Sequence, residues 1–151
     1  NGPFILYHVP TRTGAKLDLH TVQKILKLSN CIGFKDATAN LLWLDSIKDD
    51  YGYIFSGDDL SAYDYCQHGG PGLISVISNV YPELTKNFMI NHDKGIIPLL
   101  ESMNLRVNPV PIKWLLSHHK LINSNQTRSP LMPLEAQFQK ALMPYIIEEL
   151  Q

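Results

Sequence analysis

The stretch Cys31-Ile32-Gly33-Phe34-Lys35-Asp36 decides the fold class, because it is a short apolar run that ends on a lysine and a carboxylate. Alternate side chains of an extended strand point to opposite faces, so Gly33 and Lys35 share one face and Phe34 takes the other. Apolar residues on both faces are typical of a strand buried within a parallel sheet. We therefore expect a buried parallel strand here, with Lys35 at its C-terminal end.

Three further runs have a similar β-rich composition: Phe4 to Val9, Tyr53 to Ser56 and Leu73 to Ile77. Helix-like stretches separate the four runs and carry apolar residues at helical spacing, over 18–28, 40–48 and 59–68. Asp18 is suited to cap the first of these helices. Strands that alternate with helices in this way predict parallel pairing with right-handed crossovers.

Beyond Ile77 the pattern becomes helical only. The spacing predicts helices over 82–93, 96–103, 111–121 and 133–150, the last broken at Pro144, and a polar loop over 123–130. We therefore divide the chain into a β/α region, 1–80, and C-terminal helices, 81–151. A small doubly wound sheet and half of a (β/α)8 barrel both fit this periodicity, and the half barrel would have a bare inner face and unpaired edge strands.

The composition of the 151 residues is that of a globular chain, with 44% hydrophobic and 18% charged residues. A net charge of −1 gives no electrostatic reason to expect nucleic acid or an anionic membrane as partner. No apolar run approaches the roughly 20 residues that span a bilayer. Cys31 and Cys66 are the only cysteines and form no Cys-x-x-Cys motif, so we expect a reduced, cytoplasmic setting and no zinc site built on cysteines.

The first residues, Asn1-Gly2-Pro3, lead directly into an apolar strand without an initiating methionine. This beginning is typical neither of a translation start nor of a signal peptide. We therefore expect the sequence to be part of a longer chain.

Lys35 is the first candidate for chemistry. A lysine at the end of a buried strand has its stem in apolar surroundings, which favours the neutral amine that attacks carbonyl groups. The alternative is a lysine whose stem is buried while its ammonium extends toward a surface carboxylate such as Asp36. Strand position alone leaves both interpretations open.

Two candidates lie in the segment Tyr7-His8-Val9-Pro10-Thr11-Arg12-Thr13-Gly14, where the first strand ends. Active sites of β/α barrels occupy such strand ends and loops. Tyr7 can relay protons, and Arg12 can bind a carboxylate with its planar guanidinium. A packed tyrosine and a solvated arginine are the alternatives.

The ends of the third and fourth runs contribute smaller signals. Gly57 in Ser56-Gly57-Asp58-Asp59 permits close approach of a ligand, while the two acids are suited to capping the next helix. The glycine-rich segment 69–72 lacks the lysine and hydroxyl residue of a P-loop, so we interpret it as a turn. Ile74 offers an apolar wall. The adjacent His118 and His119 point in different directions on a helix and predict no metal site.

Together these segments resemble the dihydrodipicolinate synthase family of the N-acetylneuraminate lyase superfamily. The first strand end resembles the family's Tyr-Asn-Val-Pro-x-Arg-Thr-Gly, and the segment around Lys35 resembles its Gly-hydrophobic-Lys-acid-Ala strand. Four more segments match the family in the same order: 56–59, 69–76, 108–113 and 128–131. The resemblance spans nearly the whole chain and implies the C-terminal half of a (β/α)8 barrel with about four β/α units, followed by helices, in a protein that is normally a homotetramer.

The resemblance also implies roles for individual residues. Lys35 would form the imine with pyruvate, and Tyr7 would pass protons beside it. Arg12 would bind the carboxylate of the second substrate, while Gly57 and Ile74 would line the pyruvate pocket. No cofactor or metal is implied.

The implied activity is that of a lyase that condenses pyruvate with aspartate semialdehyde to 4-hydroxy-tetrahydrodipicolinate, on the route to diaminopimelate and lysine. Arg12 favours this member over a sugar-acid aldolase such as N-acetylneuraminate lyase, which stays an alternative together with a non-catalytic remnant. The first four β/α units of the family are missing, so we expect the isolated chain to be inactive. His8 stands where the family pattern has asparagine.

Overall fold

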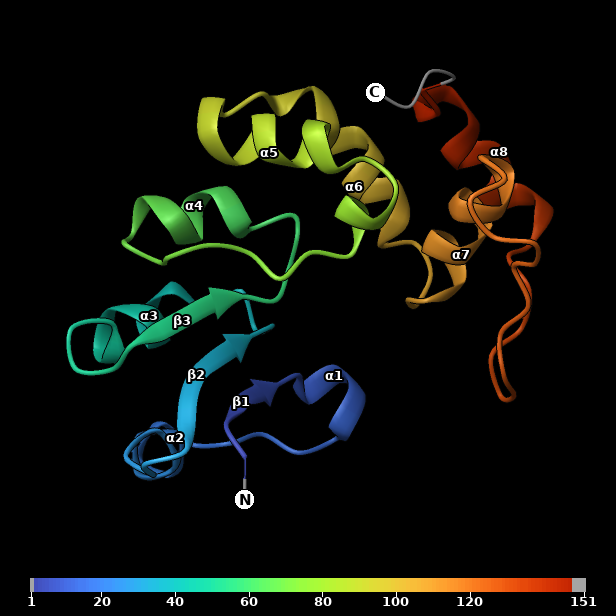
Figure 1. Ribbon diagram of the computed structural model, residues 1–151. Helices are drawn as coiled ribbons and strands as arrows, with labels where there is room; N and C mark the ends of the chain where they lie inside the picture. Colours follow the sequence, from blue (N-terminus) through green and yellow to red (C-terminus); the bar gives the residue numbers. More distant parts are fainter. Residues whose placement is uncertain (1, 148–151) are drawn as a thin grey trace. The chain divides into compact units, whose positions relative to one another are not determined.

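The structure is a computed structural model that describes residues 2–147. The chain divides into two compact units, Asn1–Ser75 and Val76–Gln151, and each is described by itself. Figure 1 shows that strands alternate with helices in the first unit and that helices alone make up the regular structure of the second.

A three-stranded parallel sheet is the centre of the first unit. Its strands are β1 (Phe4–His8), β2 (Cys31–Asp36) and β3 (Tyr53–Ser56), paired in the order β1-β2-β3. The register places Tyr7 opposite Lys35 and His8 opposite Asp36. The predicted parallel pairing is therefore confirmed, and the Lys35 strand is the central one of the three.

The fourth predicted strand, Leu73 to Ile77, is reduced to a single parallel bridge between Ser56 and Leu73. Two backbone hydrogen bonds hold it: Ser56 N donates to Gly72 O over 2.9 Å, and Ile74 N donates to Ser56 O over 2.9 Å. Among the described residues this segment has no strand on its other side, so the ladder does not continue. The chain turns instead into a short 3-10 helix, η1 (Ile77–Asn79).

The helices of the first unit are α1 (Pro10–Thr13), α2 (Leu19–Leu26), α3 (Leu41–Ile47) and α4 (Ala62–Gln67). The predicted cap of α2 is confirmed, because the Asp18 carboxylate accepts a hydrogen bond from Thr21 N over 2.8 Å. Helix α4 begins three residues later than predicted, since Asp58 Oδ2 accepts from Ser61 N over 2.9 Å and holds a turn there. The turn α1 was not predicted; Gly14, at a φ of 64°, closes it in the left-handed conformation.

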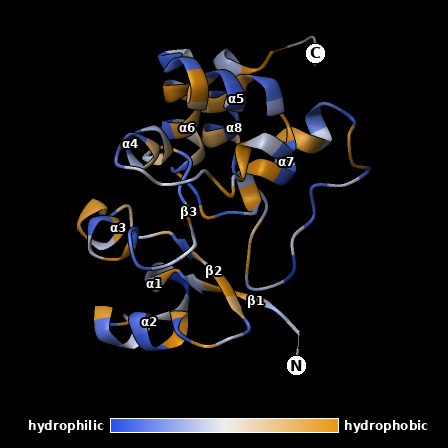
Figure 2. Ribbon diagram, turned by 60° about the vertical axis from the view of Figure 1, so that its left-hand side comes forward, coloured by the Kyte–Doolittle hydropathy of each residue, from blue (hydrophilic) through white to orange (hydrophobic). Residues whose placement is uncertain are grey.

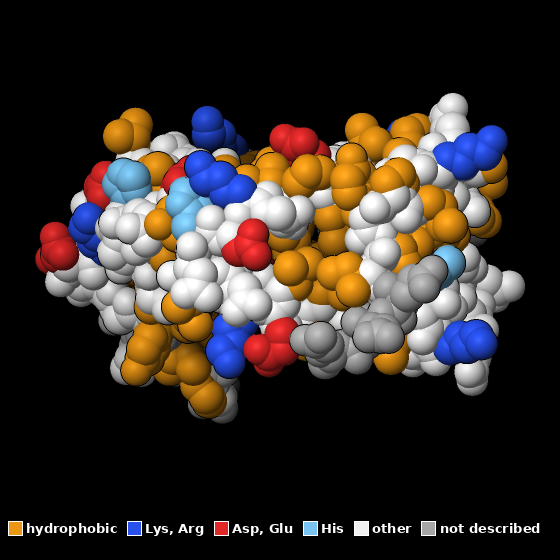
Figure 3. Space-filling view, turned by 90° about the horizontal axis from the view of Figure 1, so that it is seen from above, with side chains coloured by type: hydrophobic (Ala, Val, Ile, Leu, Met, Phe, Trp, Pro, Cys, Tyr) orange, Lys and Arg blue, Asp and Glu red, His pale blue; other side chains and the backbone are white. Residues whose placement is uncertain are grey.

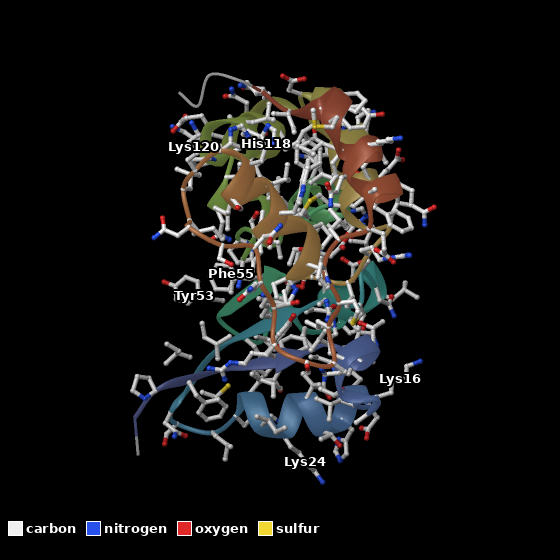
Figure 4. All side chains as sticks on the ribbon, turned by 90° about the vertical axis from the view of Figure 1, so that its right-hand side faces the viewer. Lys16, Lys24, Tyr53, Phe55, His118 and Lys120 are labelled. Carbon is white, nitrogen blue, oxygen red and sulfur yellow. The ribbon has the colours of Figure 1, made fainter. Side chains whose placement is uncertain are left out.

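One face of the sheet is covered and the other is open. The covered face packs with the helices into a core of fully buried side chains: Val22, Phe34, Leu44, Ile47, Ile54 and Tyr65. The open face carries exposed residues of β1 and β3, with Ile5 41%, Tyr7 48% and Tyr53 64% exposed. Figure 2 shows the apolar colouring along the strands, and Figure 4 shows Tyr53 beside Phe55, whose rings stack at 6.1 Å. The open face is therefore apolar and aromatic.

The second unit contains the C-terminal helices. They are α5 (Pro82–Asn91), η2 (Lys94–Ile96), α6 (Ile97–Met103), α7 (Val110–His118), α8 (Ala136–Leu142) and η3 (Met143–Tyr145). The last predicted helix, 133–150, is thus shorter: α8 gives way to η3, which contains Pro144, and 148–150 lie outside the described residues. The predicted loop 123–130 contains no helix or strand.

A buried tyrosine and a histidine connect three parts of the second unit. Tyr81 Oη lies 2.7 Å from His119 Nε2, next to the end of α7, and accepts a hydrogen bond from Ile147 N over 3.3 Å. The Tyr81 hydroxyl can donate to His119 Nε2 when the histidine is neutral and carries its proton on Nδ1. Burial first, and the neighbouring His118 second, lower the pKa of His119.

This lowered pKa predicts a loss of stability in mild acid. As pH falls below about 6.5, the unfolded chain binds a proton at this histidine before the folded chain does. The urea midpoint should therefore decrease through that range and level off below the folded pKa of His119. In His119→Gln this part of the pH dependence should disappear, whereas His20→Gln, on the exposed side of α2, should keep it. An unchanged pH profile in His119→Gln would contradict the assignment.

Candidate active site

Lys35 and Tyr7 lie side by side at the C-terminal ends of neighbouring strands. Their Cα atoms are register partners of β1 and β2, which places both side chains on the open face of the sheet. Lys35 Nζ lies 4.4 Å from the centre of the Tyr7 ring. The structure therefore brings together the two residues that the sequence predicts to be catalytic.

Gly57 packs directly against the stem of Lys35. A Cβ atom built on Gly57 would lie 2.9 Å from Lys35 Cε and 3.0 Å from Ala37 Cβ, closer than carbon atoms can pack. Gly57 N also donates to Asp36 O over 2.6 Å, which fixes the two strand ends to each other. A side chain at this position would require the lysine stem to shift, so Gly57 lies beside the predicted nucleophile and leaves it room.

The charge environment of Lys35 has two opposing parts. Burial, the larger effect, lowers the pKa of the amine, and the negative charge of Asp59 raises it. Asp36 is not an ion-pair partner for Lys35, because its side chain lies on the covered face and is 1% exposed. The alternative in which Lys35 extends toward Asp36 is therefore wrong.

Asp59 is the residue of this site that sequence reasoning missed. The sequence interpretation treated Asp58 and Asp59 together as helix caps, but the N-cap of α4 is Ser61, without a side-chain cap hydrogen bond, and Asp58 accepts from Ser61 in the turn before the helix. Asp59 instead accepts a hydrogen bond from the Ser75 hydroxyl and acts electrostatically on Lys35. Sequence periodicity cannot distinguish the roles of two adjacent carboxylates. The bridge between Ser56 and Leu73 lies close to Ser75 in the chain, and Ser75 is the hydrogen-bond partner of Asp59.

The Asp59 charge predicts a measurable shift at Lys35. In Asp59→Asn the attraction that favours the ammonium is lost, so the pKa of Lys35 should fall further below its ordinary value. The pH dependence of ¹³C-methylated Lys35 in NMR titrations measures this, and its midpoint should move to lower pH. Asp58→Asn is the matched control, because it removes the same charge at the adjacent position. A larger shift in the control would refute the assignment.

The other two predicted residues are Ile74 and Arg12. Ile74 is half-buried in the bridge segment beside the end of β3, where its N–H donates to Ser56 O. Arg12 is exposed on α1, and its guanidinium makes no hydrogen bond or ion pair with any residue that the structure describes. The structure thus groups Tyr7 and Gly57 around Lys35, and it shows Arg12 as a free cation after the β1 strand end.

Metal ligands are not grouped in the described part of the chain. Residues 2–147 contain no cluster of three histidine, cysteine or acidic side chains able to hold a metal ion. Cys31 and Cys66 are free thiols.

None of the helices described is long and apolar enough to cross a membrane. On the face in Figure 3, basic and acidic side chains are interspersed among apolar ones.

Comparison with known proteins places this chain in a family. Residues 1–149 match the Dihydrodipicolinate synthetase family. Curated relatives include the 4-hydroxy-tetrahydrodipicolinate synthases of Buchnera aphidicola, 38% identical over 146 residues, and of Shigella dysenteriae, 37% identical over 147 residues. In each case the alignment covers 87% of this chain and 50% of the relative, so the chain spans about half the length of the curated relatives it matches.

Solved structures agree with the sequence comparison. The chloride-inhibited dihydrodipicolinate synthase of Acinetobacter baumannii, complexed with pyruvate, is 31% identical, with a TM-score of 0.82 over 94% of this chain and 53% of that one. The 4-hydroxy-tetrahydrodipicolinate synthase of Methylacidiphilum fumariolicum is 27% identical, with a TM-score of 0.84 over 94% and 52%. These matches confirm the predicted fold class, half of a (β/α)8 barrel with C-terminal helices, over a small doubly wound sheet. The chain belongs to the dihydrodipicolinate synthetase family.

Proposed function

We propose that this chain supplies the Schiff-base lysine, Lys35, of a synthase that condenses pyruvate with aspartate semialdehyde. The observation that carries the proposal is the half-buried Lys35 amine, held between the Tyr7 ring and Gly57 with its pKa lowered by burial. A lowered pKa increases the fraction of neutral amine, which is the nucleophile for a keto group. The names of the curated relatives and the pyruvate in the Acinetobacter structure support this choice of substrate.

The chemistry follows from the position of the amine. Lys35 Nζ adds to the keto carbon of pyruvate, and loss of water from the adduct gives an iminium ion. Loss of a methyl proton then gives the enamine, which forms a carbon–carbon bond with the aldehyde carbon of the second substrate. Tyr7, beside Nζ, is placed to pass the protons that these steps add and remove.

Binding of substrate is assigned to the residues around this pair. Gly57 leaves room for pyruvate beside the imine, and Ile74 contributes an apolar wall. Arg12, a free cation after β1, binds the carboxylate of aspartate semialdehyde with a bidentate hydrogen bond. No cofactor is needed, because the lysine itself supplies the electron sink once it is an iminium ion.

The open face of the sheet indicates the partner that the site requires. Ile5, Tyr7 and Tyr53 are exposed on that face, on the side where Lys35 lies. In a closed barrel such residues are covered by the remaining strands. The partner we propose is therefore the other half of the barrel, with a homotetramer as the complete assembly and the cytoplasm as its compartment; the isolated chain is expected to show no turnover.

The test is chemical trapping of the imine. The chain, alone and with the N-terminal half of a curated relative, is incubated with pyruvate and borohydride, digested, and examined by mass spectrometry. A reduced pyruvate adduct on Lys35 is expected in the complemented sample. Absence of an adduct with the complementing half present, while that half is shown to bind, would favour a non-catalytic remnant and sink the proposal.

The second substrate is tested with Arg12→Ala. If Arg12 binds the semialdehyde carboxylate, the variant should lose condensation by at least about 100-fold while it keeps the pyruvate adduct, because a charge-assisted bidentate contact contributes about 3 kcal/mol. Equal condensation activity in the variant would count against the synthase assignment, for which a sugar-acid aldolase such as N-acetylneuraminate lyase is the alternative.

A further inference from the structure

Three polar side chains are buried together on the covered face of the sheet, opposite the candidate active site. His8 is 2% exposed, Asp36 1% and Tyr65 1%. Each has an atom that is fully buried and has no hydrogen-bond partner among the described residues: His8 Nε2, Asp36 Oδ2 and Tyr65 Oη. Buried polar atoms are almost always hydrogen-bonded, because an unpaired one costs its full desolvation energy. These three atoms therefore need an explanation.

The backbone places the three side chains near one another. His8 and Asp36 are register partners at the ends of β1 and β2, and they point to the same face. The charge of His8 lowers the pKa of Asp36, and the charge of Asp36 contributes to raising the pKa of Tyr65, although burial is the first cause of both raised values. Asp36 is thus within electrostatic reach of both His8 and Tyr65.

The side chains that contact the cluster are mainly aromatic or apolar, which leaves few hydrogen-bond partners for its polar atoms. The His8 ring stacks on Trp43 at 5.2 Å, nearly parallel at 11°, and Trp43 also stacks on Phe34. Tyr65 belongs to the apolar core, and the other oxygen of Asp36 accepts from Thr38 N over 2.9 Å. Lys35, the residue before Asp36 on β2, lies on the opposite face of the sheet. Apart from the Thr38 amide, the contacts named here are with apolar and aromatic groups, which leaves the three polar atoms as candidate partners in one cluster.

We propose that one shared water molecule joins Asp36 Oδ2, as acceptor, to His8 Nε2 and the Tyr65 hydroxyl, as donors, and that this cluster fixes the register of β1 against β2. Register is the property that matters here. Tyr7 and Lys35 precede His8 and Asp36 by one residue each, so any slip that separates the buried pair also separates the pair on the open face.

The cluster assigns a positioning role to His8, Asp36 and Tyr65. Two backbone hydrogen bonds already cross these strand ends, Ala37 N to His8 O over 3.0 Å and Gly57 N to Asp36 O over 2.6 Å. Backbone bonds alone do not select a register, since a shifted ladder can form equivalent ones. Burial of a polar pair does select it, because any other register leaves a carboxylate or an imidazole without a partner. The consequence for imine formation rests on the proposed function; the register itself does not.

The test compares two replacements of His8 that keep different properties. His8→Phe keeps the aromatic stacking on Trp43 but removes the N–H donor, whereas His8→Asn removes the ring but keeps a donor. The readout is the nuclear Overhauser contact between the Tyr7 ring and the Lys35 side chain, together with hydrogen exchange of the Ala37 amide. We expect His8→Asn to keep the contact, and His8→Phe to lose it and to exchange at Ala37 at least tenfold faster. A contact that survives in His8→Phe and is lost in His8→Asn would overturn the proposal.

A measurement on the unaltered chain keeps the proposal testable if His8→Phe does not fold. In ¹⁵N-labelled chain, His8 should be the Nε2–H tautomer, with an exchange-protected side-chain proton that Tyr65→Phe shifts. The Nδ1–H tautomer, or an Nε2 proton unmoved in Tyr65→Phe, would refute the hydrogen-bond cluster. Pyruvate trapping on Lys35 is read separately, so its failure in the complemented chain tests the proposed function and leaves the register result intact.

Discussion

Lys35→Arg is expected to abolish the borohydride-trapped pyruvate adduct of the complemented chain. Arginine retains the positive charge and much of the length of lysine, but its guanidinium does not lose a proton at accessible pH and cannot form an imine. The charge balance with Asp59 is therefore kept while the nucleophile is removed. The loss should reach the detection limit of the mass measurement, because no residual route to the same adduct exists at this position.

The control for this variant is Lys24→Arg. Lys24 is exposed on α2, and Figure 4 shows it extending away from the helix. It should react with pyruvate only at the background rate of a surface lysine, so its replacement should leave the adduct on Lys35 unchanged. An adduct of equal yield in Lys35→Arg, or one distributed over surface lysines in the original chain, would contradict the assignment of the nucleophile.

Phe34→Ala is expected to have the largest effect on stability. The Phe34 ring is fully buried between the sheet and its helices, where it packs in the core and stacks on Trp43 at 6.4 Å. Removal of a buried aromatic ring costs about 3–5 kcal/mol, from lost transfer energy and from the cavity that remains. Against the 5–15 kcal/mol that is typical of folded domains, such a loss removes much of the margin. Urea denaturation followed by circular dichroism measures it.

Ile32→Ala provides a control on the same strand. Ile32 is 52% exposed, so its truncation removes little buried area and leaves no cavity. Its cost should stay below about 1 kcal/mol, as for most changes at exposed positions. Similar losses in the two variants would mean that the covered face of the sheet is not the core of this unit.

Much of the first unit could be predicted from its sequence, because its strands obey simple rules. Phe34, the largest apolar residue of its run, is buried, and Asp18 caps α2 as expected. The helix boundaries were less predictable. Asp58 holds a turn that delays α4, and the sequence does not distinguish this turn from a first turn of helix. Leu73 was expected to begin a full strand, but a strand requires a neighbour, and neighbours are not a property of the segment itself.

The candidate site could also be predicted from the sequence only in part. Tyr7 and Lys35 were predicted to be close, and parallel register brings them together. Their roles, and those of Arg12 and Ile74, stay predictions until imine formation is measured. His8 and Tyr65 could not be connected from sequence, because a strand end and a helix meet there only through the tertiary fold. The role of Asp59 could not be predicted, because the sequence does not show which of two adjacent carboxylates will face which partner in the folded chain.

The two compact units described above each contain one tryptophan, Trp43 in the first and Trp114 in the second. Trp43 stacks on the His8 imidazole, and Trp114 lies 5.4 Å from the His118 ring. Each unit therefore has an intrinsic fluorophore of its own beside a potential quencher. With one tryptophan replaced by phenylalanine, the emission of the other reports on a single unit. Coincident curves from the two variants would identify one cooperative transition, and separate curves would give each unit its own melting point.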